Sequence, residues 1–287
     1  MSAAALPAAP ITATVEIAPG VHVPQVGLGV FQVAADDVQP VVEEALEVGY
    51  RHFDTAAAYN NEAGVGAAVR VSGVPREDVV VTSKLRNGEQ GYESALRAYA
   101  DTCQRLGLDR LDLYLIHWPN PEAGLWPQSW RAFERLRADD DVRAIGVSNF
   151  LPEHLRRLAA EAQVLPAVNQ VELHPTHTRP DVVAACRDLG IVVESYSPMG
   201  QGQDLGGAPV LAAAAAHGVT PAQVVLRWHL QHGYVVIPKT TSRARLVENL
   251  DLDSFELAPE EMAAIDDLDA GRRIGNDPST FSISQIR

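Results

Sequence analysis

The chain has 287 residues, of which 46% are hydrophobic and 21% charged, an ordinary composition for a globular protein. Its net charge of -14 argues against a general binder of nucleic acids or anionic membranes, because phosphate contacts need clustered positive charge. No apolar run reaches the ~20 residues of a membrane span, residues 1–10 lack the basic region of a signal peptide, and two cysteines make no disulfide framework. We therefore expect a cytoplasmic protein with a flexible tail (1–13) and one domain (14–287).

The predicted elements begin with a β-hairpin, because runs 14–17 and 21–23 flank Pro19-Gly20. After it, short β-branched runs alternate with longer stretches of helical spacing. The predicted strands are 26–29, 51–54, 79–84, 111–117, 142–148, 167–172, 191–196 and 234–239. The predicted helices between and after them are 37–48, 60–72, 91–106, 128–138, 152–161, 180–189, 221–231 and 243–250, with two additional helices at 208–217 and 259–268.

This alternation predicts a parallel sheet, because parallel neighbours need crossover connections. It runs from Val26 to Leu268, close to the ~250 residues of a (β/α)8 barrel. The competing doubly wound sheet would show a glycine-rich turn after its first strand, and this sequence has none there. Gly64-Val-Gly66 lies inside a predicted helix and indicates helix packing. The predicted fold is α/β: a (β/α)8 TIM barrel with an N-terminal β-hairpin and two additional helices.

Polar and charged side chains stand where the predicted strands end. In a (β/α)8 barrel these ends meet on one face, where active sites lie. The sequence places there Asp54, Lys84, His117, Ser148-Asn149, Asn169-Gln170, Tyr196-Ser197 and Lys239. Taken singly, Asp54 could cap a helix, Lys84 could be a surface residue and His117 a core histidine. Because burying unpaired charge is costly, their register on one rim instead predicts a functional site.

Tyr59 follows Asp54 by five residues and can reach the same face from a loop. Tyrosine is a weak acid with an unperturbed pKa of ~10. A neighbouring ammonium favours the phenolate, so Lys84 should lower the pKa of Tyr59 towards a useful general acid. Asp54 would hold Lys84 charged, and a neutral His117 would hydrogen-bond a substrate carbonyl. These residue types predict proton donation to a carbonyl that receives a hydride.

Over nearly its whole length the sequence resembles the aldo-keto reductase family. The matching segments are Gly49-Tyr-Arg-His-Phe-Asp-Thr-Ala56, Tyr59-Asn-Asn-Glu62, Ser83-Lys84, Leu111-Asp-Leu-Tyr-Leu-Ile-His-Trp-Pro119, Gly146-Val-Ser-Asn149, Asn169-Gln-Val-Glu-Leu-His-Pro175 and Ile237-Pro-Lys239 with Arg245, Glu248 and Asn249. The short segment 197–207 and the segment 271–281 are similar to the bacterial branch that includes 2,5-diketo-D-gluconate reductases. The resemblance implies that Tyr59 is the general acid, that Asp54 and Lys84 support it, and that His117 orients the carbonyl. It also implies a monomer, the commonest state in the family.

A basic cluster points to the cofactor. Lys239, Arg243 and Arg245 fall within seven residues, beside three hydroxyl side chains, in an otherwise acidic chain. Barrels often bind phosphate after their last strands; the alternative, a basic first turn of a helix, is disfavoured by the helix dipole. By the resemblance, Lys239, Thr240 and Arg245 hold the 2′-phosphate of NADPH, which binds without a Rossmann fold, while Arg243 has no assigned place. The resemblance implies further cofactor contacts from Ser148, Asn149, Gln170, Tyr196, Ser197, Glu248 and Asn249.

The substrate pocket is less defined by the sequence. Phe31, Trp118 and Trp126 are candidates for its apolar lining, and the segment after Leu268 could cover it. Arg86 stands where the resembled branch commonly has tryptophan. One hypothesis is that Arg86 binds a carboxylate beside the substrate carbonyl; a solvent-facing arginine is the alternative.

Three functions remain open. The favoured one is an NADPH-dependent reductase that converts an aldehyde or ketone (a dicarbonyl, keto ester or keto sugar acid) into an alcohol. The second is a non-catalytic NADP(H)-binding sensor, against which the acid machinery weighs. The third is a metal hydrolase on the same barrel, suggested by the spacing of His174 and His177. No Cys or carboxylate accompanies them at convincing ligand spacing, so we expect no metal and a structural role for His174.

Overall fold

The computed structural model describes residues 13–282. Its strands are β1 (Thr14–Ala18), β2 (Val21–Pro24), β3 (Leu28–Gly29), β4 (His52–Asp54), β5 (Val80–Leu85), β6 (Leu111–Ile116), β7 (Val142–Ser148), β8 (Val168–Glu172), β9 (Val192–Tyr196) and β10 (Val235–Val236). Its α-helices are α1 (Ala35–Val48), α2 (Glu62–Val71), α3 (Tyr92–Leu106), α4 (Trp126–Ala138), α5 (Pro152–Glu161), α6 (Pro180–Asp188), α7 (Ala208–His217), α8 (Pro221–Gln231), α9 (Arg243–Leu250) and α10 (Pro259–Asp266). The 3-10 turns are η1 (Ala57–Tyr59), η2 (Arg76–Asp78), η3 (Asn87–Glu89) and η4 (Gly200–Gly206).

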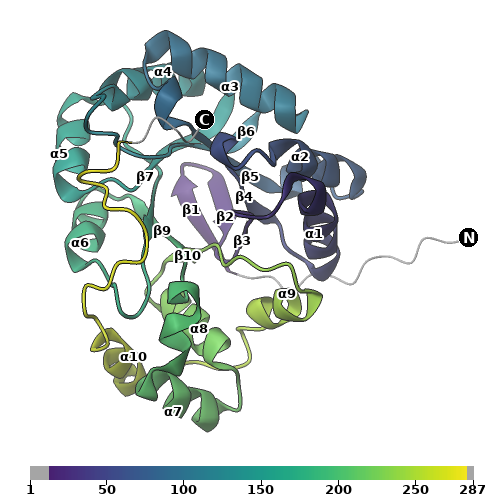
Figure 1. The fold of residues 1–287 in the computed structure, drawn as a ribbon, viewed down its shortest axis with the longest axis vertical. Helices are drawn as coiled ribbons and strands as arrows, with labels where there is room; N and C mark the ends of the chain where they lie inside the picture. The colour runs from purple at the N-terminus through teal and green to yellow at the C-terminus, as the bar shows by residue number, and fades with distance from the viewer. Residues whose placement is uncertain (1–12, 283–287) are drawn as a thin grey trace, which may run out of the picture.

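Eight parallel strands form one curved sheet in chain order from β3 to β10, with helices around its outside (Figure 1). A parallel bridge between Val26 and Val236 joins its two edges, with Gly27 N–H donating to Val236 O at 2.8 Å. At this seam a Cβ on Gly29 would lie 2.8 Å from Ile237 O, so only glycine fits so close an approach. The predicted (β/α)8 fold is confirmed, and its polar strand ends share one face.

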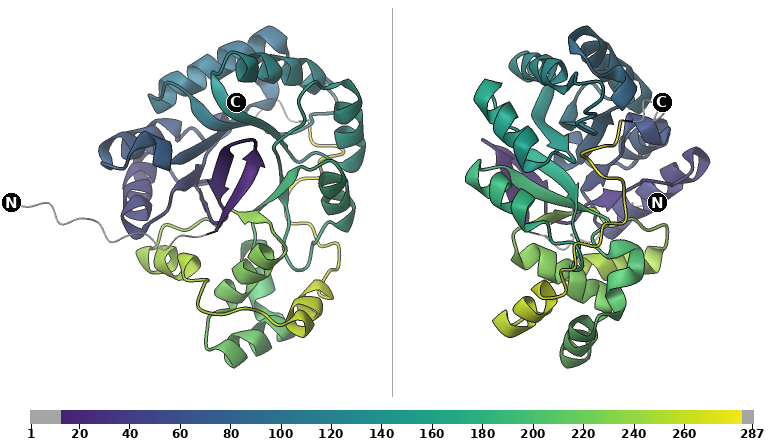
Figure 2. Two further views of the ribbon diagram at one scale, coloured as in Figure 1. Left: turned by 180° about the vertical axis from the view of Figure 1, so that it is seen from behind. Right: turned by 60° about the vertical axis from the view of Figure 1, so that its left-hand side comes forward.

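The N-terminal hairpin covers the opposite end of the barrel. β1 and β2 pair antiparallel, and Figure 2 (left) shows them lying across the sheet seen from behind. Ile17, Val21 and Val23 pack in one buried cluster with Leu113 and Val168 from the barrel interior. Burial of this apolar surface closes one end and leaves the other for ligands.

The additional helices α7 and α10 lie at one side of the barrel, and their predicted positions, 208–217 and 259–268, are confirmed with an end shift of two residues in α10. Within residues 13–282 no single helix is long and apolar enough to cross a membrane. Helices α7 and α8 reach that length only as a pair, with a bend of 98° between them.

Three predicted boundaries were wrong in informative ways. The predicted strand 234–239 is reduced to β10, where Pro238 has no N–H for a ladder. The predicted strand 26–29 is reduced to β3, with Val26 in an isolated bridge. The predicted helix 60–72 begins only at Glu62, because Asn60 adopts a left-handed conformation with φ of 56°. The predicted tail lies, except for Ala13, outside the described residues, and the single-domain boundary stays a prediction.

Candidate active site

Four predicted catalytic side chains meet at the carboxyl ends of three neighbouring strands. Asp54 ends β4, Lys84 lies near the end of β5, and His117 directly follows β6. Tyr59 sits on η1, a single 3-10 turn between β4 and α2, rather than on an irregular loop. Asp54, Lys84 and His117 are buried, and Tyr59 is half-buried. The barrel register thus assembles residues from three separate parts of the chain.

The Lys84 ammonium is the centre of this group. It donates to Asp54 Oδ1 at 2.5 Å, to Thr55 O at 3.0 Å and to Tyr59 Oη at 3.4 Å. The rings of Tyr59 and His117 meet edge to face with centroids 5.7 Å apart. A reacting group above the tyrosine hydroxyl therefore has the imidazole as its neighbour.

The protonation states suit a neutral donor. Burial is the largest single influence on the pKa of Lys84 and lowers it, but the charges of Asp54, Tyr59 and Glu194 and the hydrogen bond to Asp54 together outweigh burial, and the net pKa is raised. Burial raises the pKa of Tyr59, and Lys84 offsets this only in part. The expected lowering of the tyrosine pKa was therefore wrong for the protein alone, because desolvation is the larger effect. Burial, followed by Lys84, holds the pKa of His117 well below its usual range, so His117 is neutral at pH 7.

A second group of polar side chains lies next to the catalytic group, on or directly after β7, β8 and β9. Gln170 on β8 donates from Nε2 to Asp54 Oδ2 at 2.7 Å and to Glu194 Oε1 at 2.9 Å. Hydrogen bonds from Gln170 Nε2 to these two carboxyl groups fix the orientation of the amide, and no donor among residues 13–282 bonds to its Oε1. Tyr196 Oη donates to Asn149 Oδ1 at 2.8 Å, and Ser148 Oγ to Gln170 O at 2.8 Å. Ser197 follows Tyr196 with a left-handed φ of 49°. Because Gln170 Oε1 can still accept a hydrogen bond, it suits the N–H of a carboxamide, and this group of side chains therefore fits a nicotinamide.

The basic cluster separates into two groups with different partners. Arg243 faces away and pairs with Glu44 at 3.5 Å and Glu47 at 3.1 Å on α1. Lys239 and Arg245 are exposed and make no ion pair with the described residues, so both are free for an anion. Of the other predicted cofactor residues, Thr240 Oγ1 accepts from Ser242 N–H, Glu248 accepts from Thr220 Oγ1 at 2.7 Å, and Asn249 is buried.

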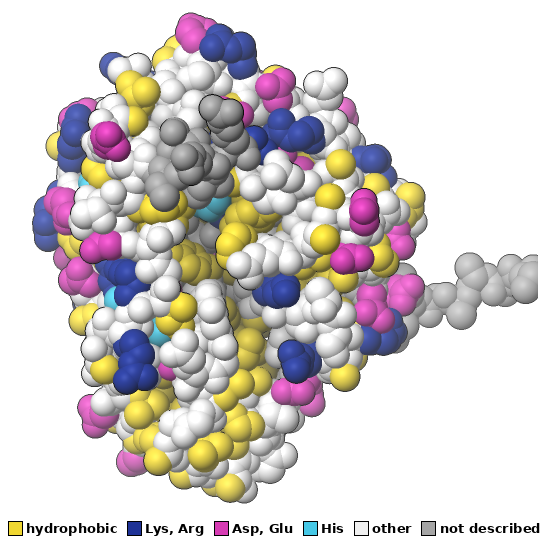
Figure 3. All heavy atoms as spheres, viewed as in Figure 1, with side chains coloured by type: hydrophobic (Ala, Val, Ile, Leu, Met, Phe, Trp, Pro, Cys, Tyr) yellow, Lys and Arg dark blue, Asp and Glu magenta, His cyan; other side chains and the backbone are white. Residues whose placement is uncertain are grey.

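Aromatic side chains flank the catalytic group on the substrate side. The ring of Phe31, 53% exposed, lies 5.0 Å from that of Tyr59. Trp118 stacks on His117 and contacts Phe281 with centroids 4.4 Å apart. The prediction for Trp126 was wrong: its ring packs against Phe150 and His154 in the core. Figure 3 shows this face of the molecule hollowed, with apolar side chains inside the hollow.

The C-terminal segment crosses this face, running from α10 past α6 and α5 (Figure 1). The Glu172 carboxylate accepts from the backbone N–H groups of Ile274 at 2.5 Å and Gly275 at 2.7 Å. Near the end of the described chain, Ser282 Oγ accepts from Glu122 N–H at 3.0 Å. The expectation that the segment after Leu268 covers the pocket is consistent with these contacts.

His174 links this segment to the turn η4. Its Nδ1 lies 2.7 Å from Asp204 Oδ2 and its Nε2 lies 3.2 Å from Glu172 Oε1. Among the described residues, no group of three or more His, Cys, Asp or Glu side chains could hold a metal ion. His177, the other histidine of the pair, is buried, and neither of its ring nitrogens is hydrogen-bonded to a residue within 13–282. The two histidines do not converge on a common ligand.

We expect the free energy of unfolding to fall as the pH rises through about 9. Burial lowers the pKa of His174, but its bonds to Asp204 and Glu172 outweigh burial and raise the pKa to about 9. Because the unfolded pKa is about 6.5, the stabilisation is complete below that pH and is lost as the folded pKa is passed. Urea unfolding at several pH values between about 6.5 and about 9 measures this loss of stability, with His174→Gln as the control. If the unfolding free energy changed equally with pH in the wild type and in His174→Gln, the raised pKa would not belong to His174.

Sequence reasoning missed Glu194. It lies inside β9, fully buried, with Oε2 bonded to no described residue. Burial, followed by the nearby Asp54 charge, raises the pKa of Glu194 to about 8. A charged residue type inside a buried strand was the available signal, but only the strand ends were considered. Sequence reasoning also missed Asn61, whose Nδ2 donates to Val30 O at 2.9 Å and Val33 O at 3.1 Å.

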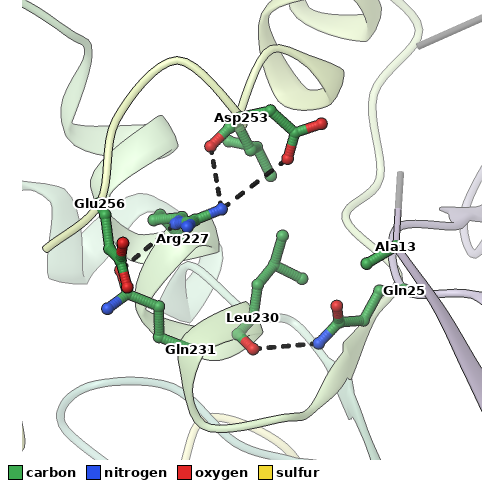
Figure 4. A pocket seen from close by; sticks show the side chains of 8 residues that line it. Ala13, Gln25, Arg227, Leu230, Gln231, Asp253 and Glu256 are labelled. Atoms are coloured by element: carbon green, nitrogen blue, oxygen red, sulfur yellow. Dashed lines mark hydrogen bonds and ion pairs between the residues drawn. The ribbon is translucent and has the colours of Figure 1, made fainter. Parts of the chain in front are cut away.

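A separate hollow of about 350 Å³ lies beside α8 (Figure 4). Gln25, at the start of the barrel, lines it and donates to Leu230 O at 3.0 Å. Arg227 donates to Leu252 O at 3.3 Å and lies 3.8 Å from Asp253. Arg227 Nε also donates to Gln231 Oε1 at 3.3 Å, and none of the predicted site residues lines this hollow.

Comparison with known proteins is consistent with this geometry. A family model described as "Aldo/keto reductase family" matches residues 25–205 and 208–270. An aldo-keto reductase of Mycolicibacterium smegmatis is 48% identical over 265 residues, covering 92% of this chain and 96% of that protein. A glyoxal reductase of Bacillus subtilis is 46% identical over 266 residues, covering 92% and 96%. The crystal structure of a Gox0644 mutant in complex with NADPH superposes with a TM-score of 0.91 at 41% identity, covering 95% and 99%.

Proposed function

The chain belongs to the aldo/keto reductase family and is an NADP(H)-dependent oxidoreductase that reduces carbonyls, and on that premise we propose that Tyr59 is the general acid of the reaction. The observation that carries the proposal is the contact of the Lys84 ammonium with both Asp54 and the Tyr59 hydroxyl. A half-buried tyrosine that keeps its proton, beside a fixed positive charge, is suited to giving that proton to a developing alkoxide.

Each side chain has a distinct task in this proposal. The Tyr59 hydroxyl donates the proton to the carbonyl oxygen as negative charge develops there. Lys84 stabilises the phenolate left behind, because an ammonium 3.4 Å away in a dry site interacts strongly. Neutral His117 presents a ring N–H to the same oxygen and aims it. Asp54 keeps Lys84 charged and in place.

NADPH supplies the hydride when bound. Gln170, Ser148 and Asn149 would hold the carboxamide, and the Tyr196 ring would support the nicotinamide. Lys239, Thr240 and Arg245 would hold the 2′-phosphate, with Glu248 and Asn249 towards the adenine. The unpaired Lys239 and Arg245 and the free Gln170 oxygen support these assignments, whereas Arg243 is satisfied by α1.

The proposed substrates are small carbonyl compounds: α-dicarbonyls first, then keto esters and keto sugar acids. Phe31 and Trp118 offer an apolar wall beside Tyr59 and His117, which suits a compact substrate. The likeness to a glyoxal reductase supports the dicarbonyls. A monomeric, cytoplasmic enzyme remains the expectation from the sequence, as does the closer likeness to the 2,5-diketo-D-gluconate reductase branch.

A substrate panel tests this function directly. The loss of NADPH absorbance is followed with methylglyoxal, phenylglyoxal, a β-keto ester, 2,5-diketogluconate and a simple aldehyde, with NADH as the cofactor control. We expect turnover with at least one dicarbonyl. Tight NADPH binding without turnover of any of these compounds would instead favour the non-catalytic sensor.

Cofactor choice gives a second expected result. Arg245→Ala should lower kcat/KM for NADPH about 10- to 100-fold, because hydrogen bonds to charged groups contribute ~1.5–3 kcal/mol. The value for NADH, which lacks the phosphate, should hardly change. Arg243→Ala is the matched control, since Arg243 pairs with Glu44 and Glu47. If both substitutions lowered kcat/KM for NADPH equally, the proposal that Arg245 binds the 2′-phosphate would be wrong.

A further inference from the structure

Arg86 hydrogen-bonds to the turn that carries Tyr59. It follows β5 directly and is half-buried. Its Nη2 donates to two acceptors on that turn, Ala57 O and Asn60 Oδ1, the second at 2.7 Å. Both hydrogens of Nη2 are therefore used within the protein. A solvent-facing arginine would show neither contact.

The turn needs such support. η1 is one 3-10 turn, a structure that is marginal in isolation. Its closing bond, from Asn60 N–H to Ala57 O, is 3.4 Å long, and no side chain caps its start. On its far side, Asn61 accepts from Thr55 Oγ1 at 2.7 Å and donates to Val30 O. Asn61 thus holds one end of the turn, and Arg86 holds the other.

Lys84, in β5, and Arg86, directly after it, both contact the segment that carries Tyr59. Lys84 reaches Asp54, Thr55 and Tyr59 Oη, while Arg86 reaches Ala57 O before Tyr59 and Asn60 Oδ1 after it. The contact from Lys84 Nζ to Tyr59 Oη is already long at 3.4 Å. A small outward shift of the turn would break it.

We propose that Arg86 is a positioning residue for this reaction: its guanidinium holds the η1 turn so that the Tyr59 hydroxyl stays within reach of Lys84 and the substrate oxygen. The proposal rests on the proposed role of Tyr59. It differs from the hypothesis that Arg86 binds a substrate carboxylate, for which only Nε and Nη1 remain because Nη2 already has two acceptors. A tryptophan here could not do the same, since indole has one N–H.

The test compares Arg86→Met and Arg86→Lys on a matched pair of substrates, neutral phenylglyoxal and the keto acid phenylglyoxylate. Arg86→Met should lower kcat about 10- to 100-fold on both, because a ~1 Å misplacement of a catalytic group has an effect of this size. KM and the Kd for NADPH should change little. Arg86→Lys should recover part of kcat, because an ammonium can donate to one of the two acceptors.

Two further variants keep the test decisive. Arg110→Met removes an exposed arginine paired with Asp140 and should leave kcat unchanged. Asn60→Gly removes the Oδ1 acceptor at a residue whose φ of 56° glycine tolerates, so it should lower kcat without a large loss of stability. It replaces Arg86→Met if that variant does not fold.

Several results would overturn the proposal. One is an Arg86→Met variant with wild-type kcat; another is a rise in KM confined to the keto acid, which would return Arg86 to carboxylate binding. In a Tyr59→Phe background, Arg86→Met should cause almost no further loss of kcat, because both substitutions act through the Tyr59 hydroxyl. If the two losses of kcat were fully additive, the positioning role of Arg86 would be wrong. Failure of the proposed function appears separately, as undiminished turnover in Tyr59→Phe alone.

Discussion

Tyr59→Phe should lower kcat for dicarbonyl reduction about 10²- to 10⁴-fold while NADPH still binds with its normal Kd. The range is that of a positioned general acid. Phenylalanine keeps the ring that contacts Phe31 and His117 and removes only the hydroxyl that Lys84 reaches at 3.4 Å. The measurement is single-turnover and steady-state reduction of phenylglyoxal, with NADPH binding followed by fluorescence.

Tyr92→Phe is the matched control for this loss. Tyr92 begins α3 with 37% of its surface exposed, so removal of its hydroxyl should leave kcat and KM as in the wild type. A Tyr59→Phe enzyme that keeps kcat within a few-fold would mean that another group or water donates the proton. His117 would then be the first candidate, because it lies beside the same site.

Lys84→Met should both abolish most activity and destabilise the fold by about 3–5 kcal/mol, the usual effect of removing one partner from a buried ion pair. Lys84 is fully buried, and its loss leaves the Asp54 carboxylate in the barrel without its 2.5 Å partner. Urea unfolding at pH 7 measures the stability term, and kcat with phenylglyoxal measures the activity term.

The double variant Lys84→Met/Asp54→Asn separates the two effects. Removing both charges should restore much of the unfolding free energy, because no uncompensated charge stays buried. It should not restore kcat, because the ammonium that stabilises the Tyr59 phenolate is still missing. Arg110→Met, from an exposed ion pair, should change stability by less than about 1 kcal/mol. Recovery of kcat in the double variant would refute the electrostatic role of Lys84.

The strand ends were predictable from the sequence because of the geometry of a parallel barrel. Short β-branched runs and longer stretches of helical spacing indicate the order of strands and helices, and all parallel strands stop on one face. Asp54, Lys84 and His117 therefore had to share a rim before any contact was known. Helix ends followed equally local signals: α5 and α8 each begin with proline at the residue predicted.

Side-chain partners were decided only by packing. Arg243 and Arg245 look alike in the sequence, yet α1 neutralises the first and leaves the second free. From the sequence, Arg86 is expected either to face solvent or to bind a substrate carboxylate, whereas in the structure it hydrogen-bonds to the turn that carries Tyr59. The direction of the tyrosine pKa shift was likewise set by burial, which no residue spacing reveals.

The barrel, the order of its strands and the set of polar residues at its mouth could be predicted from the sequence, because these follow from local patterns and chain direction. Which of those residues touch depends on how the strands pack around the barrel. Gln170 bonds to Asp54 across 116 positions of the chain, and Glu194 joins them from a third strand. Such contacts depend on barrel curvature and on which side chains fill the interior, and neither is written in the spacing along one segment.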